Sequence, residues 1–266
     1  MTTYQPDAAT DKAALYIYCV ARAKSDRVLG PIGLEDKPVY TVIAGDICAI
    51  VHDCQAEPYQ SDVPEIAQDW VLAHQRVVCA AEEVFGTILP MAFNMIVHGD
   101  AKDDAVSNLQ TWLTEKQDKF TRLLDKLTGK GEYGIQIFWD RQLVAEALVQ
   151  RDPELREMRD EALKKPKGLA YMLQQKLTKA TREAVETKAN LYVEDFYTRI
   201  RQCVDEIRVE KLKKTDDGEQ MLLNLSCLME KGSSALGNVL KEIQETEGIS
   251  VRFTGPWPPY SFVNTG

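Results

Sequence analysis

Three side chains of the segment "CAIVHDC" have types and spacing that could suit zinc binding. Cys48, His52 and Cys54 are separated by even numbers of residues, so on a β-strand all three would point to one face. Thiolate and imidazole are common zinc ligands. However, no second cluster supplies a well-spaced fourth ligand, and structural zinc sites usually hold their ligands in pairs on turns. We therefore expect no metal, but a sheet face of small apolar residues with one histidine exposed at its end.

His74 is the next candidate for chemistry, because an imidazole can activate a nucleophile. A Cys or Ser would have to lie against it, but Cys79 follows five residues later, about 500° around a helix and therefore on a different face. No glycine-rich phosphate-binding loop follows a predicted strand, because GxxxxGK[ST] is absent and the GxGxxG spacing at residues 129–134 follows a predicted helix instead. We expect His74 to be structural, and we expect no active site and no cofactor.

The order of elements in the first half indicates an α+β domain. Strand-like alternation occurs at Leu15–Val20 and on both sides of Ala44-Gly45-Asp46, where a hairpin is expected. Apolar spacings of three and four predict helices over 63–85 and about 103–127. The segments 87–97 and 133–139 indicate further strands. We expect residues 13–140 to form a ferredoxin-like variant, one mainly antiparallel sheet with both helices on one face.

From about Arg141 the pattern becomes mainly helical. Asp152-Pro153 is typical of a helix start, and helix is expected to about Lys214 with an interruption near Pro166. Strands are expected over 221–229 and 249–255, with a helix between them. We therefore expect residues 141–252 to form a helix-rich α+β domain with a small sheet, and residues 1–12 to form a loose arm.

Composition and charge exclude several classes of protein. With 266 residues, 44% of them apolar and 27% charged, the chain is typical of a globular protein with one large or two medium domains. The net charge of −9 argues against a nucleic-acid partner, and we expect the basic run Lys211–Lys214 to be a solvated helix end. Six cysteines without a CxxC pair are expected to be free thiols. Neither a secretory signal nor an apolar run of about 18 residues is present, so we expect a cytoplasmic protein without a membrane partner.

The segment "FTGPWPPYSFV" is unusual for a chain end, since unanchored tails are normally polar and poor in aromatic residues. Proline cannot continue a helix or sit in a central strand, so we expect residues 253–266 to form an extended tail. Two roles stay open for it: a staple between the domains, or an arm that contacts a partner. The residues expected to make these contacts are Phe253, Pro256, Trp257, Pro258, Pro259, Tyr260 and Phe262.

Several stretches, taken in order, resemble the gas vesicle protein F/L family (GvpF/GvpL). They are "LYIYCV", "GLEDKPVY", "GDICAIV", "HQRVV", "TILPMAFNMIV" and "TGPWPPYSFV", and the resemblance extends from about Leu15 to Val263. The chain departs from the family pattern at Cys19, where Gly is frequent. It departs again at Ala92 and Asn94, which replace the Arg and Gly of "LPxRFG". Asn tolerates left-handed backbone geometry, so a turn at position 94 can be kept.

The resemblance implies a minor structural or assembly factor of gas vesicles, located at the vesicle or in the cytoplasm. Its implied partners are the small hydrophobic shell protein, which it would keep from aggregating during nucleation, and other gas vesicle accessory proteins. It implies no enzymatic activity. The residues themselves leave two alternatives open: a small-molecule-binding regulatory module on a ferredoxin-like fold, and an enzyme.

Overall fold

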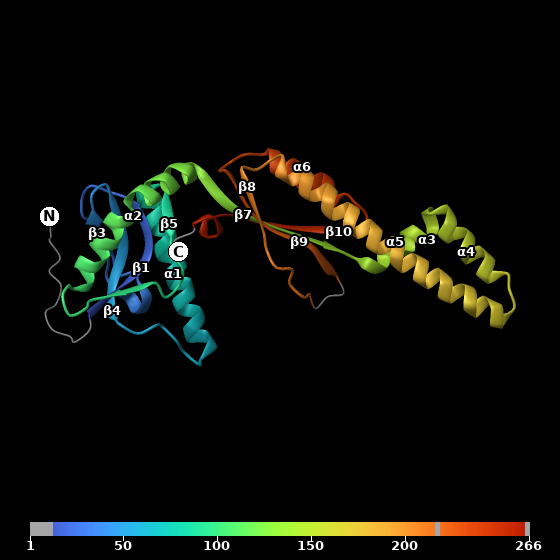
Figure 1. The fold of residues 1–266 in the computed structure, drawn as a ribbon, viewed down its shortest axis with the longest axis horizontal. Helices are drawn as coiled ribbons and strands as arrows, with labels where there is room; N and C mark the ends of the chain where they lie inside the picture. The colour runs from blue at the N-terminus through green and yellow to red at the C-terminus, as the bar shows by residue number, and fades with distance from the viewer. Residues whose placement is uncertain (1–12, 216–218, 264–266) are drawn as a thin grey trace. The chain divides into compact units, whose positions relative to one another are not determined.

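The computed structural model describes residues 13–215 and 219–263 of the chain (Figure 1). Contacts divide these residues into two compact units. The first contains the described residues up to Lys130 together with the segment from Pro258, and the second is Gly131–Trp257. Each unit combines helices with its own sheet, so the predicted α+β class is confirmed. The loose arm predicted for residues 1–12 lies outside the described residues.

The sheet of the first unit is built around strand β1. Its strands follow the order β2-β3-β4-β1-β5, and β6 also pairs with β1. The β3–β4 pair is the predicted hairpin, and it turns at Gly45, whose φ of 64° favours glycine. The stretch 87–97 forms two short strands, which both run antiparallel to β1. The strands are β1 (Ala13–Arg22), β2 (Val28–Gly30), β3 (Val39–Ala44), β4 (Ile47–Gln55), β5 (Ile88–Pro90) and β6 (Ile96–His98).

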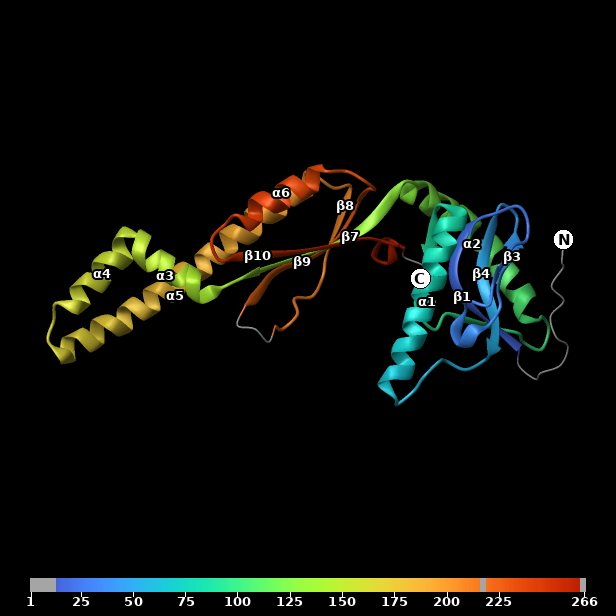
Figure 2. The ribbon, with the colours of Figure 1, turned by 180° about the vertical axis from the view of Figure 1, so that it is seen from behind.

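Helices α1 (Pro64–Phe85) and α2 (Ala105–Leu127) form where the apolar spacing predicts them. The prediction that both pack on one face of the sheet was wrong. One buried cluster joins Tyr16, Tyr18 and Cys48 of the sheet to α1 and contains no residue of α2. Alternate strand residues such as Ile17 are buried on the opposite face, and α2 contacts these same strands. Figures 1 and 2 accordingly show the sheet between the two helices.

The second unit contains a four-stranded sheet in the order β10-β7-β9-β8. We expected the strand ending at Trp139 to close the first domain at residue 140. Instead β7 lies in the second sheet, so the division falls near Gly131. The reason is that Ile135 and Ile137 pack in one cluster with apolar residues of β9 and three helices of this unit. The strands are β7 (Lys130–Trp139), β8 (Glu206–Val209), β9 (Gln220–Glu230) and β10 (Ile249–Trp257).

Four helices accompany this sheet, and the longest is α5 (Lys167–Arg201). The prediction of helix to about Lys214 was wrong, because β8 follows α5 and pairs antiparallel with β9. The basic run Lys211–Lys214 therefore lies in a loop and not at a helix end. The predicted helix start is confirmed, since the Asp152 carboxylate accepts two backbone N–H groups. The other helices are α3 (Arg141–Arg151), α4 (Pro153–Leu163) and α6 (Ala235–Gln244).

The segment expected to be a tail is divided between the two units. Phe253–Trp257 belongs to β10, at the edge of the second sheet, where proline is tolerated. The segment from Pro258 groups with the first unit, and Tyr260–Phe262 forms a short 3₁₀ turn there. The predicted tail was therefore too long, because residues 253–257 are part of β10. Within the described ranges, we find no helix long and apolar enough to cross a membrane.

Candidate functional site

Strand β10 exposes two large aromatic side chains to solvent. Phe253 is 44% exposed and Trp257 is 50% exposed, and Pro256 between them is also exposed. By contrast, Pro258, Pro259 and Phe262 are buried, and Tyr260 is partly buried. The seven residues singled out in the sequence thus separate into an exposed group on β10 and a buried group in the first unit.

The edge position of β10 explains why its aromatic residues are accessible. β10 pairs antiparallel with β7 on one side, and the described residues place no strand on the other. The Phe253 ring stacks on Tyr133 with centroids 5.5 Å apart and an interplanar angle of 8°, which fixes its direction. The strand then bends at Gly255, whose φ is 116°. A Cβ at Gly255 would lie 2.7 Å from the backbone oxygen of Glu132, so only glycine fits.

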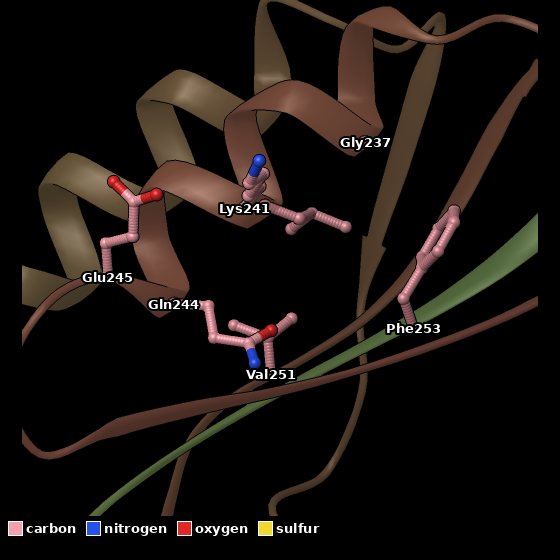
Figure 3. A pocket seen from close by; sticks show the side chains of 7 residues that line it. Gly237, Lys241, Gln244, Glu245, Val251 and Phe253 are labelled. Atoms are coloured by element: carbon pink, nitrogen blue, oxygen red, sulfur yellow. The ribbon is translucent and has the colours of Figure 1, made fainter.

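An open groove of about 480 Å³ runs between α6 and β10, beside the Phe253 ring (Figure 3). Gly237 lies at one end of the groove on α6, and no atom occupies the space that its Cβ would take. A glycine inside an amphipathic helix, as at Gly237, is the one local signal in the sequence that could have indicated the groove, since it marks close approach or open space. The groove is lined by Gly237, Leu240, Lys241, Gln244, Glu245, Val251 and Phe253.

The groove has the character of a binding surface and not of a catalytic centre. Its apolar side chains are Leu240 of α6 and Val251 and Phe253 of β10, and α6 also contributes charged and amide groups to the lining. Lys241 and Glu245 carry opposite charges at its border, and none of the lining residues is a nucleophile placed against a base. Such an arrangement can hold an extended apolar segment, with polar groups at the rim to orient it.

The buried group of residues packs against α1 within the first unit. The Tyr260 hydroxyl donates to Oε1 of Gln75 at 3.0 Å, and its ring lies 6.4 Å from the His74 ring. Burial raises the pKa of Tyr260 well above its usual range, so the phenol stays protonated and can donate. The contacts of this segment are therefore specific and not only apolar.

His52 belongs to a buried hydrogen-bond network, so the expectation of an exposed histidine at this position was wrong. It has no exposed surface. Its Nδ1 lies 2.8 Å from the Tyr18 hydroxyl, and its Nε2 lies 3.0 Å from the Tyr59 hydroxyl. Since the Tyr18 hydroxyl also accepts the Leu34 N–H at 2.9 Å, its own proton is available to Nδ1. Burial lowers the pKa of His52 to about 4, which keeps the imidazole neutral.

His74 occupies a second position of this kind on α1. The Tyr16 hydroxyl accepts the Asn94 N–H at 3.2 Å and lies 2.8 Å from His74 Nδ1. Burial lowers the pKa of His74 to about 4, and the Met91 backbone partly opposes this shift, although Nε2 forms no hydrogen bond of acceptable geometry. Asn94 adopts the left-handed turn expected of it, with φ of 66°. No local pattern singled out Tyr16 and Tyr18, because they alternate along β1 as apolar residues do.

The three candidate zinc ligands share one face of β4, but their surroundings do not suit a metal. Burial raises the pKa values of Cys48 and Cys54 to about 12, and zinc binds the thiolate and not the thiol. Both ring nitrogens of His52 face tyrosine hydroxyls. A search of the described residues finds no group of three or more potential ligands close enough to hold a metal. All six cysteines are free thiols.

Comparison with known proteins gives one consistent family. The family model described as "Gas vesicle synthesis protein GvpL/GvpF" matches residues 14–264. Gas vesicle protein L1 of Halobacterium salinarum is 31% identical over 256 residues, which cover 93% of this chain and 89% of that protein. Gas vesicle protein L of Haloferax mediterranei is 33% identical over 241 residues, covering 86% and 72% of the two chains.

Two solved structures share the fold. The crystal structure of gas vesicle protein GvpF from Anabaena sp. PCC7120 has a TM-score of 0.72 at 19% identity and covers 96% of this chain and 99% of that one. The crystal structure of GvpF from Microcystis aeruginosa has a TM-score of 0.62 at 21% identity and covers 94% and 98%. At these identities the likeness establishes the architecture alone.

Proposed function

This chain belongs to the GvpL/GvpF family of gas vesicle synthesis proteins, and from that premise we propose that it binds the hydrophobic shell protein of the gas vesicle and keeps it from aggregating during nucleation and assembly. Its relatives are named as gas vesicle proteins, so a gas vesicle-associated, structural or accessory role follows from the family. Binding of the shell protein and cooperation with other gas vesicle accessory proteins are what we propose beyond this family-level role.

The observation that carries the proposal is the pair of exposed aromatic residues on β10. Phe253 and Trp257 present aromatic surface next to the α6–β10 groove, and the outer backbone edge of β10 is open among the described strands. An exposed edge strand can add an extended segment of another chain by backbone hydrogen bonds. Aromatic side chains beside it supply the apolar contact area that dominates most interfaces.

The chemistry of the expected partner fits this surface. A shell subunit that must turn an apolar face toward gas is prone to aggregate before it assembles. A partner that covers this face needs accessible apolar groups but no reactive ones. The net charge of −9 helps to keep such a protein in solution, because like charges oppose self-aggregation.

A pull-down with purified shell protein tests the proposal. The double variant Phe253→Ala, Trp257→Ala should retain less than about a tenth of the shell protein that the wild type retains, because truncating interface anchors typically costs 2 kcal/mol or more, about thirtyfold in affinity. Val209→Ala is the matched control, since Val209 is an exposed apolar residue on β8, at the other edge of the same sheet. Equal retention by the double variant and the control would place the contact elsewhere.

A second function rests on the volume of the α6–β10 groove. At about 480 Å³ it falls within the range typical of small-molecule sites, about 300–1,000 Å³, so a small-molecule-binding regulatory module is the alternative. A thermal-shift screen distinguishes the two, because a ligand that binds the folded state raises the melting temperature. A nucleotide or amino acid that does so in the wild type but not in Lys241→Ala would favour this alternative.

A further inference from the structure

The turn between α4 and α5 carries a concentration of positive charge in an otherwise acidic chain. Residues 163–182 contain six of the 32 Lys and Arg residues and no Asp or Glu, whereas the whole chain has a net charge of −9. Tyr171 and Met172 are exposed in the same region, by 67% and 60%. We call this surface the basic patch, and it consists of Lys164, Lys167, Tyr171, Met172 and Lys176.

The backbone brings the members of the basic patch together. Lys164 and Lys167 lie on either side of Pro166 in the turn. Met172 and Lys176 are four residues apart on α5 and therefore neighbours on its surface. Ion pairs to Glu161 and Glu183 engage Lys165 and Lys179, which lie outside the patch. A surface of ammonium groups around large apolar side chains suits a partner that offers carboxylates around apolar side chains.

The same chain presents a surface of that complementary kind on the first half of α1. Residues 38–75 contain no Lys or Arg, and Ile66 and Leu72 are exposed there by 42% and 54%. Glu65, Asp69 and Leu72 are four and three residues apart, so they lie on one face of α1. We call this surface the acidic patch, and it consists of Asp62, Glu65, Ile66, Asp69 and Leu72.

We propose that the basic patch of one copy binds the acidic patch of a second copy. Three ammonium groups then face three carboxylates, and each patch contributes two large apolar side chains. The two patches are different surfaces, so each copy in such a contact keeps one of each kind, and copies join head to tail. This association involves neither Phe253 nor Trp257 and does not depend on the proposed binding of the shell protein.

The charge distribution favours a second copy over a nucleic acid. Outside residues 163–182, the chain holds 26 of its 32 Lys and Arg residues and all 41 of its Asp and Glu residues. A phosphate backbone would be attracted at the basic patch and repelled by the excess of carboxylates elsewhere. A second copy instead supplies the carboxylates and the apolar contact together.

Sedimentation velocity of the full chain tests the proposal. The wild type should associate with increasing concentration in about 50 mM NaCl and much less in about 500 mM, because salt screens exposed charges. Two charge-reversal variants test the contact itself. The first variant reverses the charges of the basic patch and the second reverses those of the acidic patch, so that each variant alone presents like charges at the contact. In each, the dissociation constant should rise at least about tenfold. The first variant is Lys164→Glu, Lys167→Glu, Lys176→Glu, and the second is Asp62→Lys, Glu65→Lys, Asp69→Lys.

Mixing the two variants is the decisive step. An equimolar mixture should associate again, since the unaltered acidic patch of the first variant meets the unaltered basic patch of the second, and the two reversed patches also match. A control with the same net charge as the first variant, Lys102→Glu, Lys213→Glu, Lys214→Glu, should associate like the wild type, and circular dichroism checks that all variants fold. A monomeric wild type at low salt, a mixture that stays monomeric, or a control that loses association equally would overturn the proposal. A monomeric wild type that binds single-stranded DNA through the basic patch would replace it with a polyanion site.

Discussion

Replacing Phe262 by Ala removes a large, almost fully buried side chain from the segment Pro258–Val263. Phe262 is only 2% exposed, and the Phe→Ala change at a buried position costs about 3–5 kcal/mol through lost transfer energy and the cavity that remains. A domain is stable by only about 5–15 kcal/mol. The variant should therefore lose at least about a fifth of the stability of the first unit. Trp257→Ala, at a half-exposed position five residues earlier, should cost about 1 kcal/mol or less.

Urea denaturation followed by circular dichroism measures the free energy of unfolding, and hydrogen exchange locates the change. Protection should fall in α1, because the Tyr260 hydroxyl donates to Gln75 on that helix, while the core of β9 should keep its protection. A Phe262→Ala variant that unfolds with the same free energy as Trp257→Ala would refute this reasoning. The segment would then not be a structural part of the first unit, and an arm that contacts a partner would become the better interpretation.

Three further predictions concern the two histidines, the cysteines of β4 and Gly255. Because burial lowers the pKa values of His52 and His74 from 6.5 to about 4, the unfolded chain binds more protons in this range. The free energy of unfolding should therefore fall as pH drops from 6.5 to 4, by up to about 3 kcal/mol for each histidine; a flat urea midpoint over this range would contradict it, and His74→Ala should show a shallower dependence. Elemental analysis should find no stoichiometric zinc, whereas one bound zinc that is lost in Cys48→Ser would contradict our account of the β4 face. Gly255→Ala should destabilise the second unit by roughly 1–3 kcal/mol, because φ of 116° and the close Glu132 carbonyl exclude a Cβ; an unchanged melting temperature would contradict this.

Local patterns in the sequence predicted most elements, since each depends on residues close together in the chain. The spacing of Leu109, Leu113, Phe120 and Leu124 predicted α2, and all four are buried. The same reasoning was less successful on α1, where Ile66 fits the apolar stripe but is exposed. Periodicity predicts which face of a helix is apolar, but it does not predict how far along that face the sheet extends.

Contacts between distant residues explain what the sequence did not reveal. The alternation of Ile135 and Ile137 predicted a strand, but most of their packing partners, on β9, α5 and α6, lie many residues later, so the strand was assigned to the wrong sheet. The α6–β10 groove is lined by residues of two separate elements, among them Gly237 and Phe253, and no local pattern encodes that they come together. His52 was expected to be exposed because nothing close to it in the sequence indicated a hydrogen-bond partner. Its partners, Tyr18 and Tyr59, come from two other segments.

The proposed function requires that the chain keeps the gas vesicle shell protein from aggregating through Phe253 and Trp257 of β10. Light scattering of shell protein diluted from denaturant into buffer tests this requirement most directly. The dilution is made with an equimolar amount of one of three proteins: the wild type, the double variant that carries both Phe253→Ala and Trp257→Ala, or the control Val209→Ala. The account predicts that the wild type and Val209→Ala suppress scattering while the double variant does not. Equal suppression by all three, or none by the wild type, would contradict it.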